Sequence, residues 1–239
     1  MKKFALGAAA LFAVAGTAVA QDTLAYWHFN NQGLPGGGFG FQVGEFPKGA
    51  ENGLQVGTAN LTVGGGDSLA NNGSTYTWLQ SFAGTTVNAQ FGEPAGGSIA
   101  LQNGNLGANN GAYFEFAFDA TNYQDIVFSF AGQRTATGFT SILIEAYDGA
   151  SLIGEIGTVN DLLGTFAATG LRSLSTNLLD DVADARIRLT FSGGSTASTA
   201  SAGNNRLDNI VIQGTVIPAP GAIALAGIAG LVGLRRRRA

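Results

Sequence analysis

The side chains that most often carry catalysis are scarce in this sequence. It has one histidine, His28, and no cysteine. A serine triad would have to be built on His28, yet no Gly-x-Ser-x-Gly turn is present. Zinc coordination by histidine and cysteine is excluded, because the sequence has neither a second histidine nor a cysteine. We therefore interpret His28 as a surface or cross-strand residue.

Carboxylates offer a second kind of chemistry. Glycoside hydrolysis needs two acids about 5–10 Å apart across a cleft. Glu115, Glu145 and Glu155 all fall on expected strands, so two of them could share one sheet face. Acids at outward strand positions usually only make the sheet soluble. A secreted hydrolase is therefore the least favoured function.

Asp208 is the acid in the least usual place. Strand alternation puts it on the same side as Ile210 and Ile212, which should face the core. A carboxylate there needs a partner, because an unpaired buried charge is costly. The partner could be an arginine (Arg206 or Arg134), backbone N–H groups, or a metal ion.

The metal alternative draws on oxygen-bearing side chains of the opening strand. Asp22, Asn30 and Asn31 could join Asp208 as ligands, and such hard oxygen atoms suit Ca²⁺. Jelly-roll carbohydrate-binding modules often hold a structural calcium where their first and last strands meet, and this arrangement resembles that place. The sequence thus predicts one structural calcium at Asp208, Asn30, Asn31 and Asp22.

Aromatic side chains could bind sugars, because flat rings stack on pyranose faces. Tyr76 and Trp78 share one face of an expected strand, and Tyr123 and Tyr147 are candidates elsewhere. Most aromatic residues of an all-β domain instead form core or cross-strand pairs. Tyr76 and Trp78 are the predicted ligand-binding pair.

The elements that must position these residues are β-strands. In residues 113–118 three phenylalanines alternate with Tyr113, Glu115 and Ala117, which indicates a half-buried strand with Glu115 facing outward. Residues 186–191 alternate in the same way. Further strands are expected at 24–30, 54–63, 75–82, 97–101, 125–131, 139–147, 151–159, 172–179 and 207–213, with a hairpin turn at Asp148-Gly149. Only residues 180–185 have a faintly helical pattern.

This spacing of strands and turns predicts the fold. We expect an all-β, two-sheet antiparallel sandwich of jelly-roll type over residues 21–215, with its first and last strands adjacent. The domain carries all sixteen acidic residues against Lys48 and five arginines, so its net charge is −10. Such a charge excludes nucleic acid as a partner and is compatible with cations or neutral glycans.

Residues 1–20 have the pattern of a secretion signal. Lys2 and Lys3 precede an apolar run at 4–14, and Ala18-Val19-Ala20 is a small-x-small cleavage site. The pattern predicts export through the Sec translocon, with a mature chain that begins near Gln21.

Residues 216–239 form a second signal-like segment. A hinge, Pro218-Ala219-Pro220-Gly221, precedes an apolar run at 222–234 and a cluster of four arginines, Arg235, Arg236, Arg237 and Arg238. As a helix the thirteen-residue run would be about 20 Å long, against a hydrocarbon core of about 30 Å. The arginines should stay on the cytoplasmic side of the membrane. A short hydrophobic helix that only transiently enters the inner membrane is expected, and an uncleaved anchor is the alternative.

The order of hinge, apolar run and arginine cluster resembles the sorting signal of PEP-CTERM proteins, with Pro218-Ala219-Pro220 in place of the family's Pro-Glu-Pro. Residues 25–30, 130–139 and 206–210 also resemble pieces of jelly-roll PEP-CTERM proteins. The resemblance implies processing by an exosortase-like membrane protease of a Gram-negative-type bacterium. It also implies a final place at the cell surface or in the extracellular matrix.

Three functions from different classes remain open. The leading interpretation is an exported, non-catalytic surface or matrix protein that is sorted by its tail. The alternative is a glycan-binding, lectin-like module that contacts extracellular polysaccharide. The third is the secreted hydrolase. A strip of aromatic residues on a solvent-facing sheet would favour the second, and two close carboxylates in a groove would favour the third.

The two end segments generate a first prediction. The mature protein should begin near Gln21 and lack all four arginines from Arg235 to Arg238, because it is cut near Pro218–Gly221. Intact mass spectrometry of the protein from the exporting cell measures both ends. A mature form in the inner membrane that still carries the four arginines would leave only the uncleaved anchor.

Overall fold

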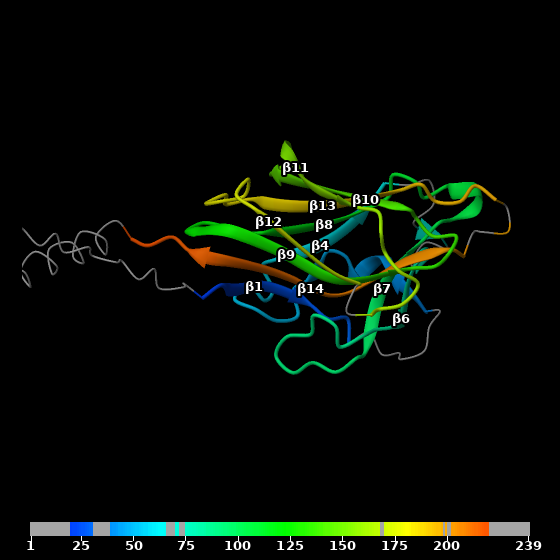
Figure 1. Cartoon of the computed structure of the whole chain (residues 1–239), viewed down its shortest axis with the longest axis horizontal. Coiled ribbons are helices and arrows are strands. Elements are labelled where there is room, and N and C mark those ends of the chain that lie inside the picture. Colours follow the sequence, from blue (N-terminus) through cyan, green and yellow to red (C-terminus); the bar gives the residue numbers. More distant parts are fainter. Residues whose placement is uncertain are drawn as a thin grey trace, which may run out of the picture.

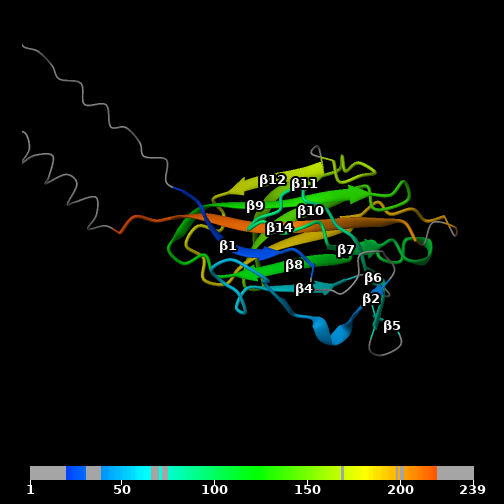
Figure 2. The ribbon, with the colours of Figure 1, turned by 90° about the horizontal axis from the view of Figure 1, so that it is seen from below.

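The computed structural model describes residues 20–30, 39–65, 70–71, 75–167, 170–197, 199 and 202–219. Within them the chain forms two antiparallel sheets, packed face to face, and two short 3-10 helices, η1 (Val43–Glu45) and η2 (Asn105–Gly107) (Figure 1, Figure 2). None of the helices found there has the length and apolar character needed to cross a membrane. The prediction of an all-β, two-sheet antiparallel sandwich is confirmed, and its form is jelly-roll-like.

Sheet A has eight strands. They are β1 (Asp22–Trp27), β2 (Phe39–Gln42), β5 (Ala70–Asn71), β6 (Thr75–Ala83), β7 (Gly97–Gln102), β9 (Tyr123–Arg134), β12 (Leu171–Thr176) and β14 (Asn204–Val216). Their order is β12-β9-β14-β7-β6-β2, with β1 also paired with β14 and β5 with β6. Strands β1 and β7 lie end to end along one side of β14, so the predicted neighbours, the first and last strands, do pair.

Sheet B has six strands. They are β3 (Lys48–Gly49), β4 (Asn60–Gly64), β8 (Tyr113–Phe118), β10 (Ser141–Asp148), β11 (Ser151–Val159) and β13 (Ala185–Ser192). Their order is β11-β10-β13-β8-β4-β3. The predicted hairpin at Asp148-Gly149 joins β10 to β11, and Gly149 takes the positive φ of 56° that this tight turn requires.

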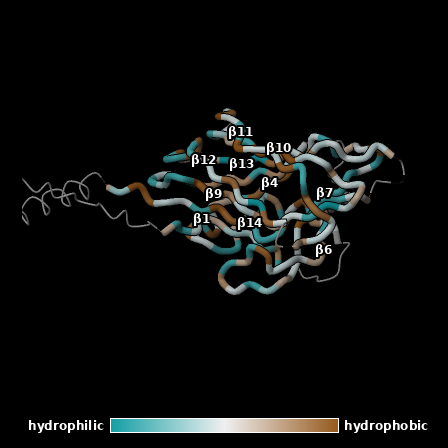
Figure 3. The backbone as a smooth tube through the Cα atoms, in the orientation of Figure 1, coloured by the Kyte–Doolittle hydropathy of each residue, from teal (hydrophilic) through white to brown (hydrophobic). Residues whose placement is uncertain are grey.

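The core lies between the sheets and is rich in phenylalanine. Phe116 on β8 is fully buried, and its ring centroid lies 5.1 Å from that of Trp27 and 5.5 Å from that of Phe128. These contacts join the central strands of the two sheets. Hydrophobic and hydrophilic segments succeed one another along the strands in Figure 3, as strand alternation requires.

Some expected strand bounds are wrong. Residues 51–59 form turns instead of extending a strand from 54 to 63, because Gly53 and Gly57 take positive φ values that break the strand. Residues 180–184 form turns and no helix, and residue 185 already begins β13; Asp181 has a φ of 58°, outside the helical region. The short strands β2, β3 and β5 were not predicted, because two to four residues carry too little alternation.

The outer ends of strands β1 and β14 lie side by side. Asp22 pairs with Gly214, so the chain enters and leaves the domain at the same end (Figure 1). Ala20, Pro218 and Ala219 are described and lie outside the strands.

Val216 is the last residue of β14 and Ile217 follows it, whereas residues 1–19 and 220–239 of the two predicted signals lie outside the described residues. The short C-terminal helix expected at 222–234 is therefore neither confirmed nor contradicted, and the cut sites stay predictions. The signal residues concerned are Ala18, Pro220, Gly221, Arg235, Arg236, Arg237 and Arg238.

Glu115 faces outward as predicted, but it is not a solvated surface acid. Only 6% of it is exposed. Its carboxylate lies 3.1 Å from Arg186 Nη1 and 2.5 Å from Arg188 Nη2. Both arginines stand on the neighbouring strand β13, which sequence alternation alone does not place beside β8.

This burial generates a prediction about stability. Glu115→Lys should lower the free energy of unfolding by roughly 2–4 kcal/mol, because it places three cations together in a partly desolvated site. Urea denaturation measures the loss. Glu155→Lys is the matched control, since Glu155 lies in the same row of the sheet on the exposed edge strand, and it should cost no more than about 0.5 kcal/mol. Equal losses in the two variants would contradict the structural role of Glu115.

Candidate functional site

A β-bulge in β14 decides where Asp208 lies. Leu207, Ile210 and Ile212 all belong to the core, which strict alternation forbids. The register with β9 shifts between Asp208 and Val211, and Asn209 takes a φ of 48°. The prediction that Asp208 shares the core side with Ile210 and Ile212 is therefore wrong.

The bulge is covered by residues 84–96, the connection between β6 and β7. The Asp208 carboxylate accepts the N–H of Thr85 at 2.6 Å and that of Asn209 at 2.8 Å. Burial raises the pKa of Asp208 to about 8, although the two N–H bonds favour its ionised form. Of the three predicted kinds of partner, the structure supplies backbone N–H groups and, among the described residues, no arginine.

The four predicted calcium ligands are only partly brought together. Asp22 pairs with Gly214, six residues along β14 from Asp208, so it lies near the other end of the strand. The Asn30 Oδ1 atom accepts the N–H of Gly97, and Asn31 lies outside the described residues. In the described part of the chain no three acidic or histidine side chains are grouped as a metal site requires. Asp22 does not lie with Asp208, and calcium binding stays a prediction for a calcium titration to test.

His28 lies in a polar cluster beside the bulge and is not at the surface. Only 4% of it is exposed, and its ring nitrogens lie 3.8 Å from Glu51 and 3.8 Å from Glu93. Its Nδ1 atom accepts the Asn30 N–H. Glu51 in turn accepts the backbone N–H groups of His28 and Phe29, each at 2.7 Å. These contacts hold the end of β1 in place. No serine hydroxyl bonds to His28 among the described residues, so the structure gives no support to a serine triad there.

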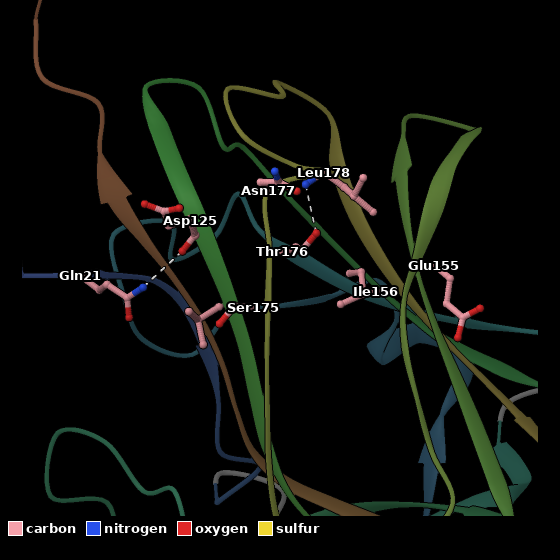
Figure 4. A pocket seen from close by; sticks show the side chains of 9 residues that line it. Gln21, Asp125, Glu155, Ile156, Ser175, Thr176, Asn177 and Leu178 are labelled. Atoms are coloured by element: carbon pink, nitrogen blue, oxygen red, sulfur yellow. Dashed lines mark hydrogen bonds between the residues drawn. The ribbon is translucent and has the colours of Figure 1, made fainter.

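The largest of the described pockets has a volume of about 660 Å³ and is next to β12 (Figure 4). Gln21, Asp125, Ser175 and Asn177 give it a polar lining, and no aromatic residue is among its nine lining residues. Its two acids, Asp125 and Glu155, lie on opposite sides of β12 in Figure 4. They do not face each other as a hydrolytic pair would.

The predicted aromatic pair is split. Tyr76 packs edge-on against Phe46, with 5.7 Å between ring centroids, and belongs to the border of the core. Burial raises the pKa of Tyr76, which agrees with this position. Trp78 is partly exposed and precedes the core residue Leu79, so it points to the other side of β6. The register of β6 against β2 shifts between residues 75 and 80, and this irregularity is what separates Tyr76 from Trp78.

Trp78 opens a set of side chains on the outer face of sheet A. These side chains alternate along their strands with residues of the core, Leu79, Ile99, Leu101 and Leu207. The strand register brings the outward residues of β6, β7, β14 and β9 next to one another. We call this surface the amide face. It consists of Trp78, Gln80, Phe82, Gln102, Gln133, Asn204 and Arg206.

The polar side chains of the amide face are ordered by contacts with one another. The Gln102 amide donates to Gln80 Oε1 at 2.9 Å, and Arg206 Nε donates to Asn204 Oδ1 at 3.0 Å. The Arg206 guanidinium lies 4.0 Å from the centroid of the Phe82 ring. Gln102 and Asn204 are buried, whereas the other five residues are partly exposed. Sequence reasoning found only Trp78, because the residues of the amide face come from four strands that are distant in sequence.

The position of Asp208 generates a prediction about pH. The folded chain keeps this proton up to about pH 8, whereas the unfolded chain loses it near the ordinary pKa of 3.8. The contribution of Asp208 to stability is therefore complete below about pH 4 and is lost as the pH rises to 8, by at most ~1.4 kcal/mol per pH unit. Urea denaturation from pH 4.5 to 8 should show this slope in the wild type and not in Asp208→Asn. If the stability of the wild type and that of Asp208→Asn change in parallel from pH 4.5 to 8, Asp208 is ionised throughout this range.

No family model and no curated protein matches this chain. Similar solved structures include the K2 cleaved adhesin domain of Lys-gingipain, at 9% identity and a TM-score of 0.41 over 84% of this chain and 99% of that one. TmCBM61 in complex with beta-1,4-galactotriose matches at 12% identity and a TM-score of 0.38, over 64% of this chain and 86% of that one. The enzymatically active domain of bacteriophage CBA120 tailspike protein 4 matches at 17% identity and a TM-score of 0.39, over 65% of this chain but only 19% of that one. The chain is a β-sandwich that resembles carbohydrate-binding modules and adhesin domains.

Proposed function

We propose that this protein is a non-catalytic glycan-binding module and that the amide face is its binding surface. The observation that supports this proposal is the combination of ring and amide side chains on one ordered surface. Trp78 offers aromatic surface on which a sugar ring can stack, whereas the Phe82 ring lies against the Arg206 guanidinium. Gln80, Gln133 and Arg206 offer donors and acceptors that suit the hydroxyl groups of a sugar.

The chemistry of this surface supports binding over hydrolysis. Hydrolysis of a glycoside needs two carboxylates about 5–10 Å apart, one of them to protonate the leaving group. None of the seven side chains of the amide face is acidic. Asp208, the nearest acid along β14, is 1% exposed and has both oxygens bonded to backbone N–H groups.

We also propose that the protein is exported and sorted to the cell surface or matrix by its C-terminal segment. The arrangement of β14 is compatible with this proposal, in which the segment holds the chain at the membrane until it is cut. Val216, at one end of this strand, leads toward the sorting segment, and Arg206 lies ten residues away in the half that bears the amide face. Ten strand residues span about 33 Å, so a glycan could reach the face while the other end is held at a membrane.

Glycan binding is tested by removing one ring. Trp78→Ala should weaken binding to polysaccharides at least tenfold and leave the melting temperature nearly unchanged, because the indole is partly exposed and stacking is lost. Affinity electrophoresis of the full-length chain through gels that contain single polysaccharides measures the effect. Phe91→Ala is the control, since Phe91 is 60% exposed on residues 84–96 and outside the amide face. Equal weakening by both variants, or no binding by the wild type, would contradict the proposal.

A further inference from the structure

Arg206 is a cation without an anionic partner in the part of the chain that the structure describes. Four of the six positive side chains in the sandwich are paired with carboxylates: Lys48, Arg172, Arg186 and Arg188. Within the described residues, Arg206 and Arg134 are not. An unpaired arginine is unexpected in a domain whose acids outnumber its bases by ten.

The surroundings of Arg206 make its lack of a partner more costly. Its guanidinium lies 4.0 Å from the Phe82 centroid, and burial lowers the pKa of Arg206 below its usual range. Of its nitrogens, Nε is held by Asn204. Among the described residues the two Nη atoms have no acceptor, so the planar edge that binds a carboxylate or sulfate remains open.

Part of the negative charge of the domain lies far from this arginine. Several aspartates lie at the end of the sandwich where β14 leads to the C-terminal segment. There Asp22 accepts a hydrogen bond from the Tyr123 hydroxyl, Asp180 from the N–H of Asp125, and Asp181 from the N–H of Asn122. Arg206 is about 33 Å from that end along β14. Because the Debye length is about 8 Å at physiological ionic strength, those aspartates repel an anion at the amide face only weakly.

We propose that the amide face takes an anionic glycan, whose carboxylate or sulfate group pairs with Arg206. The inference rests on the proposed glycan-binding function and names its ligand class. A glycan that covers the amide face removes the remaining water from the guanidinium. A neutral glycan would leave this charge desolvated and unpaired, whereas an anionic group offsets the cost with two charge-assisted hydrogen bonds.

The experiment compares polymers that differ only in charge. The full-length chain is titrated calorimetrically with polygalacturonate and its methyl ester, and with dextran sulfate and dextran. We expect at least one anionic polymer to bind tenfold or more tightly than its neutral counterpart. Arg206→Gln should remove this preference, and Arg206→Lys should keep part of it, because lysine supplies the charge but not the planar edge. Arg134→Gln is the matched control for a lost unpaired arginine and should keep the preference.

Each other outcome overturns the inference. Equal affinity for a neutral polymer and its anionic counterpart in the wild type, or a preference that survives in Arg206→Gln, refutes the role of Arg206. The same loss in Arg134→Gln would mean that overall charge, and not the amide face, selects the ligand. If neutral polymers bind as tightly as their anionic counterparts and Trp78→Ala abolishes that binding, glycan binding stands while the anionic ligand fails. Binding of no polymer at all refutes both.

Discussion

The pairing of β14 is the constraint on which the rest of the structure depends. β9 pairs along most of β14 on one side, whereas on the other side β1 covers residues 210–214 and β7 covers 204–207. At the junction, Asp208 and Asn209 have no strand partner on that side among the described residues. Buried backbone groups must be satisfied, so residues 84–96 fold over the junction. Asn88 donates to the Asn209 carbonyl at 2.7 Å, and Asn209 donates to the carbonyls of Thr85 and Val87.

The bulge also separates two regions of sheet A. On one side of it, residues 84–96 cover the sheet, and Tyr26, Asn209 and Ser129 form a bonded polar network beneath them. Burial in this network raises the pKa of Tyr26 to about 12. On the other side β14, β7 and β6 pair without a register shift and present the amide face. A connection that is required by strand pairing thus leaves only part of the sheet open to a ligand.

The outer faces of the two sheets differ in how their polar groups are used. On sheet B, the Arg188 guanidinium lies between Tyr113 and Tyr147, 4.4 and 4.5 Å from their ring centroids, and bonds to Glu115. The cation, the carboxylate and the two rings on that face are therefore already paired with one another. On sheet A, Arg206 has a ring and an amide but, within the described chain, no carboxylate. This difference makes sheet A the face with unused binding capacity, and it explains why a tyrosine-rich surface on sheet B is a weaker candidate.

Alternation in the sequence was sufficient to predict the strands that carry the core. The alternating phenylalanines of β8 and the pattern of β13 have the predicted inward sides, because strand geometry forces side chains to opposite faces. Composition also determined the absence of disulfides and the acidic charge of the domain. Pairing between distant strands decided the rest. The bulge that moves Asp208, the arginines that bury Glu115, and the amide face all arise where strands distant in sequence become neighbours, and a periodicity read along a single strand contains no information about its partners.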